Sequence, residues 1–218
     1  MNSNSVRQPP DCQHPDWKKH WEKIYAERDP GNVSWHQSHP QHSLSLIEDT
    51  GVGSTASIID VGGGTSMLVD HLLKAGYRDI TVLDIARTAI LQAQTRLGDR
   101  SQQVTWVEGD ITGYSPVQTF DIWHDRAVFH YLTCEHDRLC YLETLHKALK
   151  PSGQAIIATF SDSGPNQCSG LDVVRYSPEA LQQALGNQLQ LIETFTEEHR
   201  TPDGGLQQFV YCRFHHNA

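Results

Sequence analysis

Basic residues are scarce in this sequence. Its 218 residues contain 17 Lys and Arg against 26 Asp and Glu, which gives a formal net charge of −9. No run of basic residues breaks this balance, and proteins that bind nucleic acids through phosphates need clustered Lys and Arg. We therefore expect no nucleic-acid partner.

Long apolar runs are also missing. No stretch of the sequence approaches the roughly 20 apolar residues of a membrane span. The first ten residues, MNSNSVRQPP, lack the apolar core of a signal peptide. We expect a soluble, cytoplasmic protein without a membrane partner.

Cysteine pairs and metal-ligand clusters are absent as well. The five cysteines are odd in number and form no Cys-x-x-Cys pair, so neither a disulfide framework nor a Cys-rich zinc site is expected, and the thiols should be reduced. The spacing His36-x-x-His39-x-x-His42 is compatible with metal binding, but Pro40 interrupts it and no fourth ligand follows. We expect no metal.

The order of predicted strands and helices indicates the fold class. Short apolar strands alternate with helical segments, which is typical of βαβ crossovers and predicts an α/β fold with a mostly parallel sheet and helices on both faces. The turn sequence TPDGG joins the last two strands into a β-hairpin. Strands are expected over 56–61, 80–84, 104–108, 120–124, 154–160, 189–199 and 206–214. Helices are expected over 16–28, 39–49, 66–75, 86–96, 126–131, 135–149 and 178–185, with a turn over 150–153.

The chain length suffices for one domain. We expect a loose tail at 1–13 and a single domain at 14–218. The domain divides into an N-terminal helical cap at 14–50, a ligand-binding core at 56–160, and a substrate-side loop, helix and hairpin at 161–214.

A glycine-rich loop follows the first predicted strand. The segment 60–64 (DVGGG) places Gly62 and Gly64 between a strand and a helix, where glycine lets the backbone turn sharply and approach a ligand closely. Asp84 ends the next strand, where a carboxylate accepts hydrogen bonds from both hydroxyls of a ribose. Asp110 follows the third strand and is a candidate partner for the amino group of an adenine.

Other interpretations of this loop compete. A dinucleotide oxidoreductase needs Gly-x-Gly-x-x-Gly, and Met67 occupies the place of the third glycine. A P-loop needs a Gly-Lys-Ser/Thr ending, which does not follow here. The structural alternative is that the glycines only make a tight turn and the aspartates only cap helices.

These motifs together resemble those of class I S-adenosylmethionine (SAM)-dependent methyltransferases. DVGGGTS is similar to their first motif, EGDI to their adenine motif, FDIWHD to their fourth-strand motif and LKPSGQAIIATF to their turn into the fifth strand. The resemblance implies a Rossmann-like, seven-stranded sheet whose last strand is antiparallel. It also implies SAM as methyl donor and S-adenosylhomocysteine (SAH) as product, bound by Asp60, Gly62, Gly64, Asp84, Ile85, Asp110 and Ile111.

Aromatic residues near the N-terminus extend the resemblance. Trp21-x-x-x-Tyr25 followed by Trp35 is similar to the start of the methyltransferase-like lysine methyltransferases, which implies that these three side chains contact SAM. Aromatic rings shield a sulfonium from water and attract it by cation–π contact. The WHQ sequence at 35–37 is instead similar to an element of the thiopurine methyltransferases. The alternative is that the aromatics only pack the helix on the sheet, which is how we interpret Trp17.

Three residues at the end of the fourth strand, His124, Asp125 and Arg126, are the candidate catalytic residues. The Asp-Arg pair again resembles the thiopurine methyltransferases. Arg126 suits an anionic or aromatic substrate or the methionine carboxylate of SAM, Asp125 suits holding Arg126 or accepting a proton, and His124 suits a general base. The structural alternative is a buried Asp125–Arg126 ion pair.

We predict a SAM-dependent methyltransferase that acts on a small-molecule acceptor, such as a thiol or another soft nucleophile, by in-line displacement. The acceptor pocket is expected between the N-terminal helix, residues 124–131 and the loop 161–176. A protein lysine is the alternative acceptor, and a SAM-binding regulatory protein with weak catalysis is the alternative of another class. No Asn-Pro-Pro-Tyr segment is present, which disfavours methylation of nucleic-acid amino groups.

Overall fold

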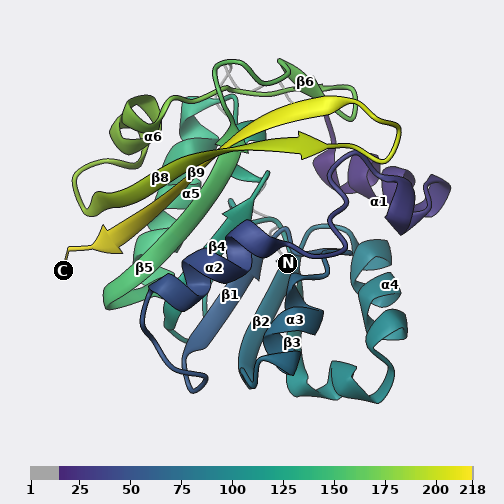
Figure 1. Ribbon diagram of the computed structural model, residues 1–218, viewed down its shortest axis with the longest axis horizontal. Coiled ribbons are helices and arrows are strands. Elements are labelled where there is room, and N and C mark those ends of the chain that lie inside the picture. The colour runs from purple at the N-terminus through teal and green to yellow at the C-terminus, as the bar shows by residue number, and fades with distance from the viewer. Residues whose placement is uncertain (1–14, 218) are drawn as a thin grey trace, which may run out of the picture.

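The computed structural model describes residues 15–217, and its centre is a seven-stranded sheet (Figure 1). The strands follow the order β3-β2-β1-β4-β5-β9-β8 across this sheet, and β6 pairs with β7 in a small second sheet. The strands are β1 (Ser57–Val61), β2 (Asp79–Asp84), β3 (Val104–Glu108), β4 (Phe120–Arg126), β5 (Leu149–Phe160), β6 (Gln167–Cys168), β7 (Leu171–Asp172), β8 (Leu189–Arg200) and β9 (Leu206–His216).

The strand directions define the edge at which a ligand binds. β3, β2, β1, β4 and β5 are parallel, whereas β9 is antiparallel to both β5 and β8. All five residues of β1 are buried because both faces of the sheet are covered. The predicted mostly parallel sheet with an antiparallel terminal hairpin is confirmed. The loops after the parallel strands therefore converge at one edge.

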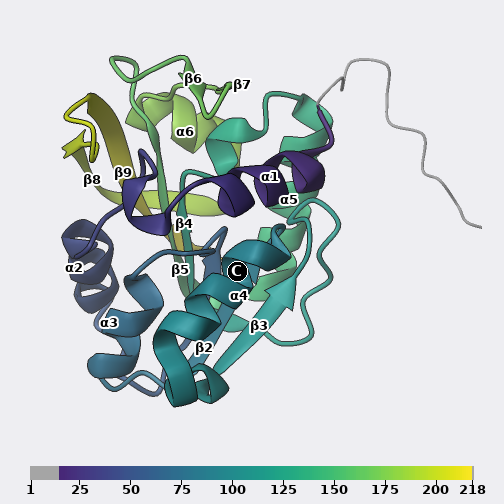
Figure 2. The same cartoon turned by 90° about the vertical axis from the view of Figure 1, so that its right-hand side faces the viewer.

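Helices cover the sheet on both faces. In Figure 1, α2 and α3 lie in front of the sheet and α5 lies behind it, and Figure 2 shows α1 beside α4. Leu46 and Leu72 pack with one face of the sheet, and Tyr141 and Leu181 pack with the other. The helices are α1 (Trp17–Glu27), α2 (Gln41–Asp49), α3 (Leu68–Lys74), α4 (Arg87–Leu97), α5 (Glu135–Ala148) and α6 (Pro178–Leu185), with 3-10 turns η1 (Pro30–Asn32), η2 (Gly98–Gln103) and η3 (Phe129–Tyr131).

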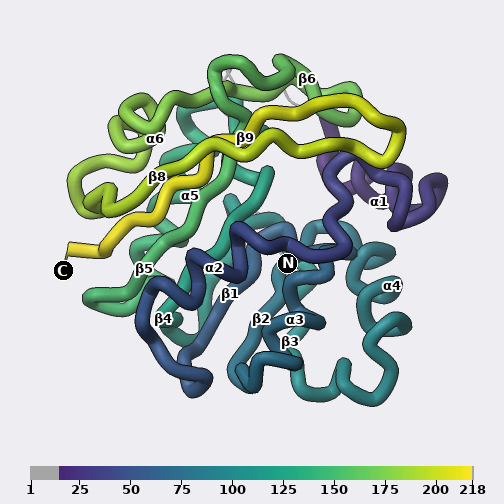
Figure 3. The backbone as a smooth tube through the Cα atoms, viewed as in Figure 1, coloured from purple at the N-terminus to yellow at the C-terminus, as the bar shows by residue number. Residues whose placement is uncertain are grey.

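The C-terminal hairpin reaches the segment that follows α1. Figure 3 shows β8 and β9 extending together toward this segment. His199 of β8 hydrogen-bonds the carbonyl oxygen of Ser34 at 2.8 Å. The two ends of the domain, far apart in sequence, therefore meet above the sheet.

The prediction of a helix at 126–131 is wrong. Strand β4 runs through Arg126, Ala127 then adopts a φ of 73°, and only the single turn η3 follows. The carboxylate of Asp125 accepts two backbone N–H groups of this turn at 2.9 and 3.1 Å. These hydrogen bonds stabilise a tight turn in place of a helix.

The turn expected at 150–153 lies within β5. The pairing of β4 with β5 shifts register between Phe120 and Ile122, and Ser152 has a φ of 62°. The backbone does turn there, but pairing with β4 already begins at Leu149. The strand is therefore longer than expected.

Several expectations concern cysteines, metals and membranes. Cys134 is disulfide-bonded, so the expectation of reduced thiols is wrong for this residue. Cys140, Cys168 and Cys212 are free. Within residues 15–217, no helix is long and apolar enough to cross a membrane, and no group of three His, Cys, Asp or Glu side chains is arranged to hold a metal. The tail predicted at 1–13 lies outside the described residues.

Candidate active site

A two-lobed cavity lies at the carboxyl ends of the parallel strands. The large lobe encloses about 860 Å³ including its open mouth, and the small lobe about 540 Å³. Both volumes are in the size range of small-molecule sites. The two lobes are neighbours, because five residues line both of them: Tyr25, Trp35, Val61, Gly62 and Arg126.

Most of the predicted site residues face this cavity. His124 and Asp60 line the small lobe, whereas Gly64 lies against Asp84 and Asp125 lies outside both linings. The predicted residues that line the large lobe are Trp21, Tyr25, Trp35, Gly62, Asp84, Ile85, Asp110, Ile111 and Arg126.

The loop after β1 needs its glycines because there is no room for side chains. Gly62 has a φ of 66°, and a Cβ atom there would lie 2.1 Å from Cγ2 of Val128. Gly64 has a φ of 36°, and a Cβ atom there would lie 2.6 Å from Oδ2 of Asp84 and 3.0 Å from the Tyr25 hydroxyl. The loop therefore brings bare backbone against the carboxylate of Asp84.

Gly62→Ala should destabilise the protein more than Gly51→Ala. Gly51 has a similar φ of 73° but no atom within 4 Å of a built Cβ. Both substitutions cost about 1–2 kcal/mol for the left-handed backbone, and Gly62→Ala should cost about 1–3 kcal/mol more for the steric conflict with Val128. Urea unfolding of both variants measures the difference. Equal losses in the two variants would contradict the close approach of Val128.

Asp84 is a buried carboxylate at the end of β2. It accepts a hydrogen bond from the Ala86 backbone N–H at 2.8 Å and lines the large lobe beside Ile85. Burial raises its pKa to about 7, and the nearby charges of Asp60 and Glu22 act in the same direction. The ionised form of such a carboxylate is stabilised when ligand hydroxyls donate hydrogen bonds in place of the water that burial has removed.

Asp110 and Ile111 form another wall of the large lobe. One carboxylate oxygen of Asp110 accepts hydrogen bonds from the Thr112 backbone N–H (2.9 Å) and hydroxyl (2.8 Å), which fixes the turn after β3. Ile111 is buried at 6% exposure and packs with the core behind the lobe. The wall thus combines a fixed carboxylate with an apolar surface.

Aromatic side chains cover the junction of the lobes. The ring centroid of Trp21 lies 5.7 Å from that of Trp35 and 5.2 Å from that of Tyr131, and Tyr25 lies 6.1 Å from Trp35. Trp17, for which we expected packing only, packs on the core and also lines the large lobe.

Helix α1 is fixed above the cavity through α4. The carboxylate of Glu22 accepts the backbone N–H groups of Arg87 (2.8 Å) and Thr88 (3.1 Å) at the start of α4, which lacks a side-chain cap of its own. A carboxylate at a helix N-terminus is stabilised by the unpaired N–H groups there. This contact holds α1, and with it Trp21 and Tyr25, in place above the cavity.

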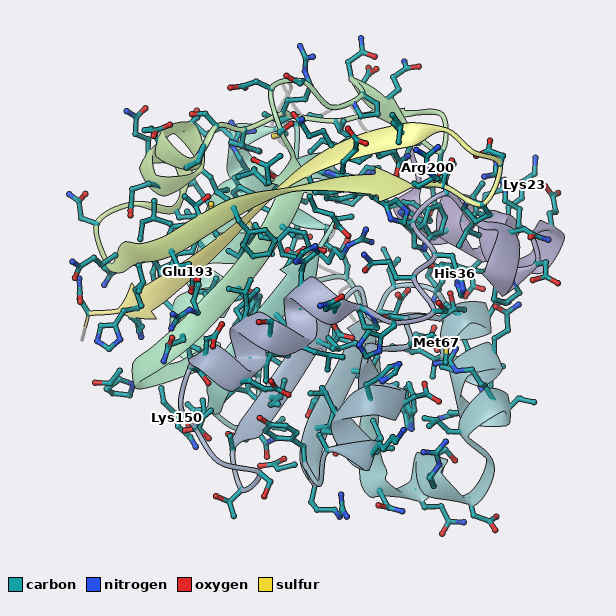
Figure 4. The ribbon with its side chains drawn as sticks, viewed as in Figure 1. Lys23, His36, Met67, Lys150, Glu193 and Arg200 are labelled. Atoms are coloured by element: carbon teal, nitrogen blue, oxygen red, sulfur yellow. The ribbon has the colours of Figure 1, made fainter. Side chains whose placement is uncertain are left out.

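The small lobe contains a buried chain of polar groups. His124 Nδ1 lies 2.7 Å from Asp60 Oδ1, and its Nε2 lies 2.8 Å from the Ser43 hydroxyl. Oδ2 of Asp60 has no hydrogen-bond partner among the described residues. Figure 4 labels His36 and Met67, which line the same lobe from the segment after α1 and from the loop before α3. Both ring nitrogens of His124 are therefore engaged.

Asp125 is fully buried beneath the site. It accepts the hydroxyl hydrogen of Tyr141 (2.7 Å) besides the two backbone N–H groups, and Tyr141 accepts the Trp123 indole N–H (2.9 Å). Burial raises the pKa of Asp125 to about 6, while the hydrogen bond from Tyr141 lowers it. Its partners position the turn after β4.

Arg126 pairs with residues other than Asp125. Its Nε donates to the Tyr211 hydroxyl (2.8 Å) and its Nη1 to the Trp35 carbonyl oxygen (3.1 Å). Its guanidinium carbon lies 4.4 Å from the ring centroid of Phe209, and its Nη2 lies 3.7 Å from Oε2 of Glu197. The Asp125–Arg126 ion pair considered from the sequence is not formed.

Three of the partners of Arg126, Tyr211, Glu197 and Phe209, come from the C-terminal hairpin, in which no site residue was predicted. Glu197 shares one strand face with Phe195 and His199, at every second position of β8. A carboxylate between two ring-bearing residues on the inward face was the available signal. Ser43 in α2 carried no comparable signal.

The cavity fits SAM on observations of its own residues. The loop after β1 has no room for a Cβ atom, as a backbone that approaches a ligand requires. A buried carboxylate ends β2, and Asp60 lines the small lobe, which suits a ligand with ribose hydroxyls and an ammonium group. The sheet order and this site define the class I SAM-dependent methyltransferase fold.

Comparisons with known proteins also find methyltransferases. Residues 59–155 match the family described as "Methyltransferase domain". The EEF1A lysine methyltransferase 2 of Danio rerio is 22% identical over 157 residues, which cover 65% of this chain and 67% of that protein. The matched segments span between 17% and 67% of the curated relatives' own lengths.

Two solved structures share the fold. The N-methyltransferase NodS from Bradyrhizobium japonicum WM9 in complex with SAH has a TM-score of 0.72 at 19% identity, over 94% of this chain and 100% of that chain. A structure described for the conversion of a disulfide bond into a thioacetal group during echinomycin biosynthesis has a TM-score of 0.74 at 19% identity, over 92% and 93%. Residues 59–155 of this chain thus match a methyltransferase domain, and the chain shares the fold of SAM-dependent methyltransferases.

Proposed function

We propose that this chain transfers the methyl group of SAM to a small-molecule acceptor with a soft nucleophile, such as a thiol. The observation that carries this proposal is the lining of the large lobe away from Asp84 and Asp110. Aromatic and apolar side chains dominate there, namely Trp21, Trp35, Tyr131, Phe160, Cys168 and Phe209. The charged group among them is the guanidinium of Arg126.

This lining favours a neutral or anionic acceptor over an ammonium ion. A lysine acceptor must lose a proton before it attacks, which requires a base or an acidic pocket. The carboxylates that line the lobes, Asp60, Asp84 and Asp110, belong to the cofactor side in this proposal. A thiol needs little activation beyond its alignment with the methyl group of SAM, and Arg126 stabilises the thiolate form.

Each predicted site residue has a role in this proposal. SAM supplies an activated methyl group. Asp84 binds the ribose hydroxyls and Asp110 the adenine amino group, with Ile85 and Ile111 packing on the base. Asp60, positioned by His124, binds the methionine ammonium. The residues that enclose the sulfonium and exclude water are Trp21, Tyr25 and Trp35, beside the glycines Gly62 and Gly64.

The three candidate catalytic residues act differently in this proposal. Arg126 contacts the reacting groups. His124 and Asp125 position their neighbours, because the hydrogen-bonding atoms of both already have partners. Neither is in position to act as a free general base. The proposed location of the enzyme is the cytoplasm, which cell fractionation tests.

A protein lysine is the second candidate acceptor. Its support is the similarity to the EEF1A lysine methyltransferase 2 and the aromatic cap formed by Trp21, Tyr25 and Trp35. In this case, the mouth of the large lobe would admit an extended side chain. The guanidinium of Arg126 would then face an ammonium group, which Coulomb repulsion disfavours.

Titration calorimetry with SAM, SAH and NADH tests the cofactor. We expect micromolar binding of the first two and none of NADH. Methyl transfer is then measured with aryl and alkyl thiols and with lysine peptides. Transfer to thiols supports the proposal, and transfer to lysine alone supports the second candidate. Binding of SAH without transfer to any acceptor would favour a regulatory SAM-binding protein, and failure to bind SAH would refute both methyltransferase proposals.

A further inference from the structure

One face of β9 carries a row of side chains along the wall of the cavity. Tyr211, Phe209 and Gln207 occupy every second position of this strand, so they share one face. Tyr211 hydrogen-bonds Arg126 at 2.8 Å, and the ring centroid of Phe209 lies 4.4 Å from its guanidinium carbon. Gln207 is the next residue of the row toward the hairpin turn, and it lines the large lobe together with Phe209. The row therefore continues past Arg126 along this lobe.

The side-chain amide of Gln207 has no hydrogen-bond partner among the residues that the structure describes. Its Oε1 is buried without a partner, whereas its Nε2 is not enclosed and no hydrogen bond occupies it either. Two neighbours are engaged elsewhere. His199, opposite on β8, lies 2.8 Å from the Ser34 carbonyl oxygen through Nε2, and Gln208 accepts the hydroxyl hydrogen of Ser161 at 2.7 Å. A polar group that lines a cavity and has no partner in the protein is free to bind water or a ligand.

This amide lies in apolar surroundings, away from the carboxylates of the lobe. Phe160 of β5 is paired with Phe209, and their ring centroids are 4.7 Å apart. Both rings line the large lobe. Asp84 ends β2 and Asp110 follows β3, and these strands lie on the other side of β1 from β5 and β9. Gln207 therefore belongs to the end of the lobe at which the acceptor is proposed to bind.

We infer that Gln207 is a specificity-determining residue for the methyl acceptor, and that it binds a neutral amide or carbonyl substituent on an aromatic acceptor. The inference rests on the proposed function and narrows its substrate class. Two residues of an antiparallel strand span about 7 Å, so Gln207 follows Phe209 at a distance comparable to a substituted benzene ring. An acceptor ring that packs on Phe160 and Phe209, with its nucleophile toward Arg126, brings a para substituent to Gln207.

The chemistry of the amide selects the substituent. A carboxamide side chain offers N–H donors and a carbonyl acceptor, so another amide or carbonyl group pairs with it without any charge. An apolar substituent of the same shape leaves the amide of Gln207 unpaired in the complex, and a site built to form a hydrogen bond discriminates against such a ligand. The hydrogen bond also aligns the acceptor ring for methyl transfer.

The experiment compares two thiols of similar shape by titration into the SAH-saturated protein. 4-Mercaptobenzamide has a carboxamide para to the thiol, and 4-isopropylthiophenol has an apolar group there. The ratio of their Kd values is measured in the wild-type chain and in Gln207→Met, which keeps the length of the side chain and removes the amide. We expect the ratio to shift about 3- to 10-fold in favour of 4-isopropylthiophenol, which corresponds to one neutral hydrogen bond. The different acidities of the two thiols act equally on both proteins, so the shift isolates the contact with Gln207.

Gln208→Met is the matched control. Gln208 is the next residue of β9, points to the opposite face and bonds Ser161, so the ratio should stay at its wild-type value. A loss of stability affects both thiols equally and does not move the ratio. An unchanged ratio in Gln207→Met, or an equal shift in Gln208→Met, would overturn the inference and leave the proposed function standing. If the wild-type chain binds SAH but neither thiol, and transfers no methyl group to either from SAM, the proposed acceptor is refuted and the inference with it.

Discussion

Asp84→Asn should make the ligand-free protein more stable at pH 8 while it weakens SAH binding. Burial raises the pKa of Asp84 from 3.8 to about 7. The folded state therefore binds this proton more tightly than the unfolded state, so stability falls as the pH rises from about 4 to about 7. At 1.36 kcal/mol per pKa unit, the ionised carboxylate costs about 4 kcal/mol above pH 7.

Asparagine removes this cost because it carries no charge. Urea unfolding should show a gain in the free energy of unfolding that is larger at pH 8 than at pH 5. Asp79→Asn is the matched control, since Asp79 is an exposed carboxylate at the start of the same strand. A gain in both variants, or a gain that does not change with pH, would contradict the buried-charge explanation.

The same substitution should reduce ligand affinity. An ionised carboxylate accepts hydrogen bonds from both ribose hydroxyls, and each hydrogen bond to a charged group contributes about 1.5–3 kcal/mol. We expect SAH to bind at least about 10-fold more weakly to Asp84→Asn. In the wild-type chain, affinity for SAH should rise from pH 6 to pH 8 as Asp84 ionises, and this dependence should vanish in the variant. Unchanged affinity would refute the ribose assignment.

The core of the fold was predictable because its information is local. The strand expected at 80–84 ends at Asp84 in the structure, and the strand expected at 104–108 has the same bounds. Buried parallel strands are short apolar runs, and the glycine loop and carboxylates directly follow them. The wall of the large lobe that contains Asp84 and Asp110 is built from those same strand ends, which is why most of the predicted residues line this lobe.

One further local rule would have predicted the geometry at the end of β4. Successive side chains of a strand point to opposite faces. His124 contacts Ser43 of α2 on one face, whereas Asp125 contacts Tyr141 of α5 on the other. Arg126 lies on the face of His124, so neighbours in sequence do not pair. The period of two, applied to FDIWHDR, would have excluded the ion pair.

The partners of Arg126 were not predictable in the same way. Glu197 and Tyr211 lie about 70 to 85 residues away along the chain, on strands that carry no recognisable motif. Only the antiparallel pairing of β8 with β9 and of β9 with β5 brings them to the cavity. A single sequence records the inward face of such a strand but not the residue that it meets.

Asp125→Ala should destabilise the protein strongly without a matching loss of SAH affinity. The substitution leaves two backbone N–H groups and the Tyr141 hydroxyl without their buried acceptor. Each unsatisfied donor costs about 1–3 kcal/mol, so we expect a loss of about 3 kcal/mol or more. Tyr141→Phe removes the hydrogen bond to the same carboxylate and also the acceptor of the Trp123 indole N–H, and should cost about 1–3 kcal/mol.

Asp125→Asn distinguishes a positioning role from a catalytic one. The amide keeps an acceptor oxygen and loses the buried charge, whose pKa is raised to about 6, so the loss of stability should be less than half that of Asp125→Ala. Turnover of the folded Asn variant should then stay within about threefold of the wild type, a change of less than 1 kcal/mol. A base that accepts a proton from the acceptor cannot be replaced by an amide. A turnover reduced by orders of magnitude in a stably folded Asp125→Asn protein would therefore show that Asp125, and not solvent, accepts the proton of the methyl acceptor.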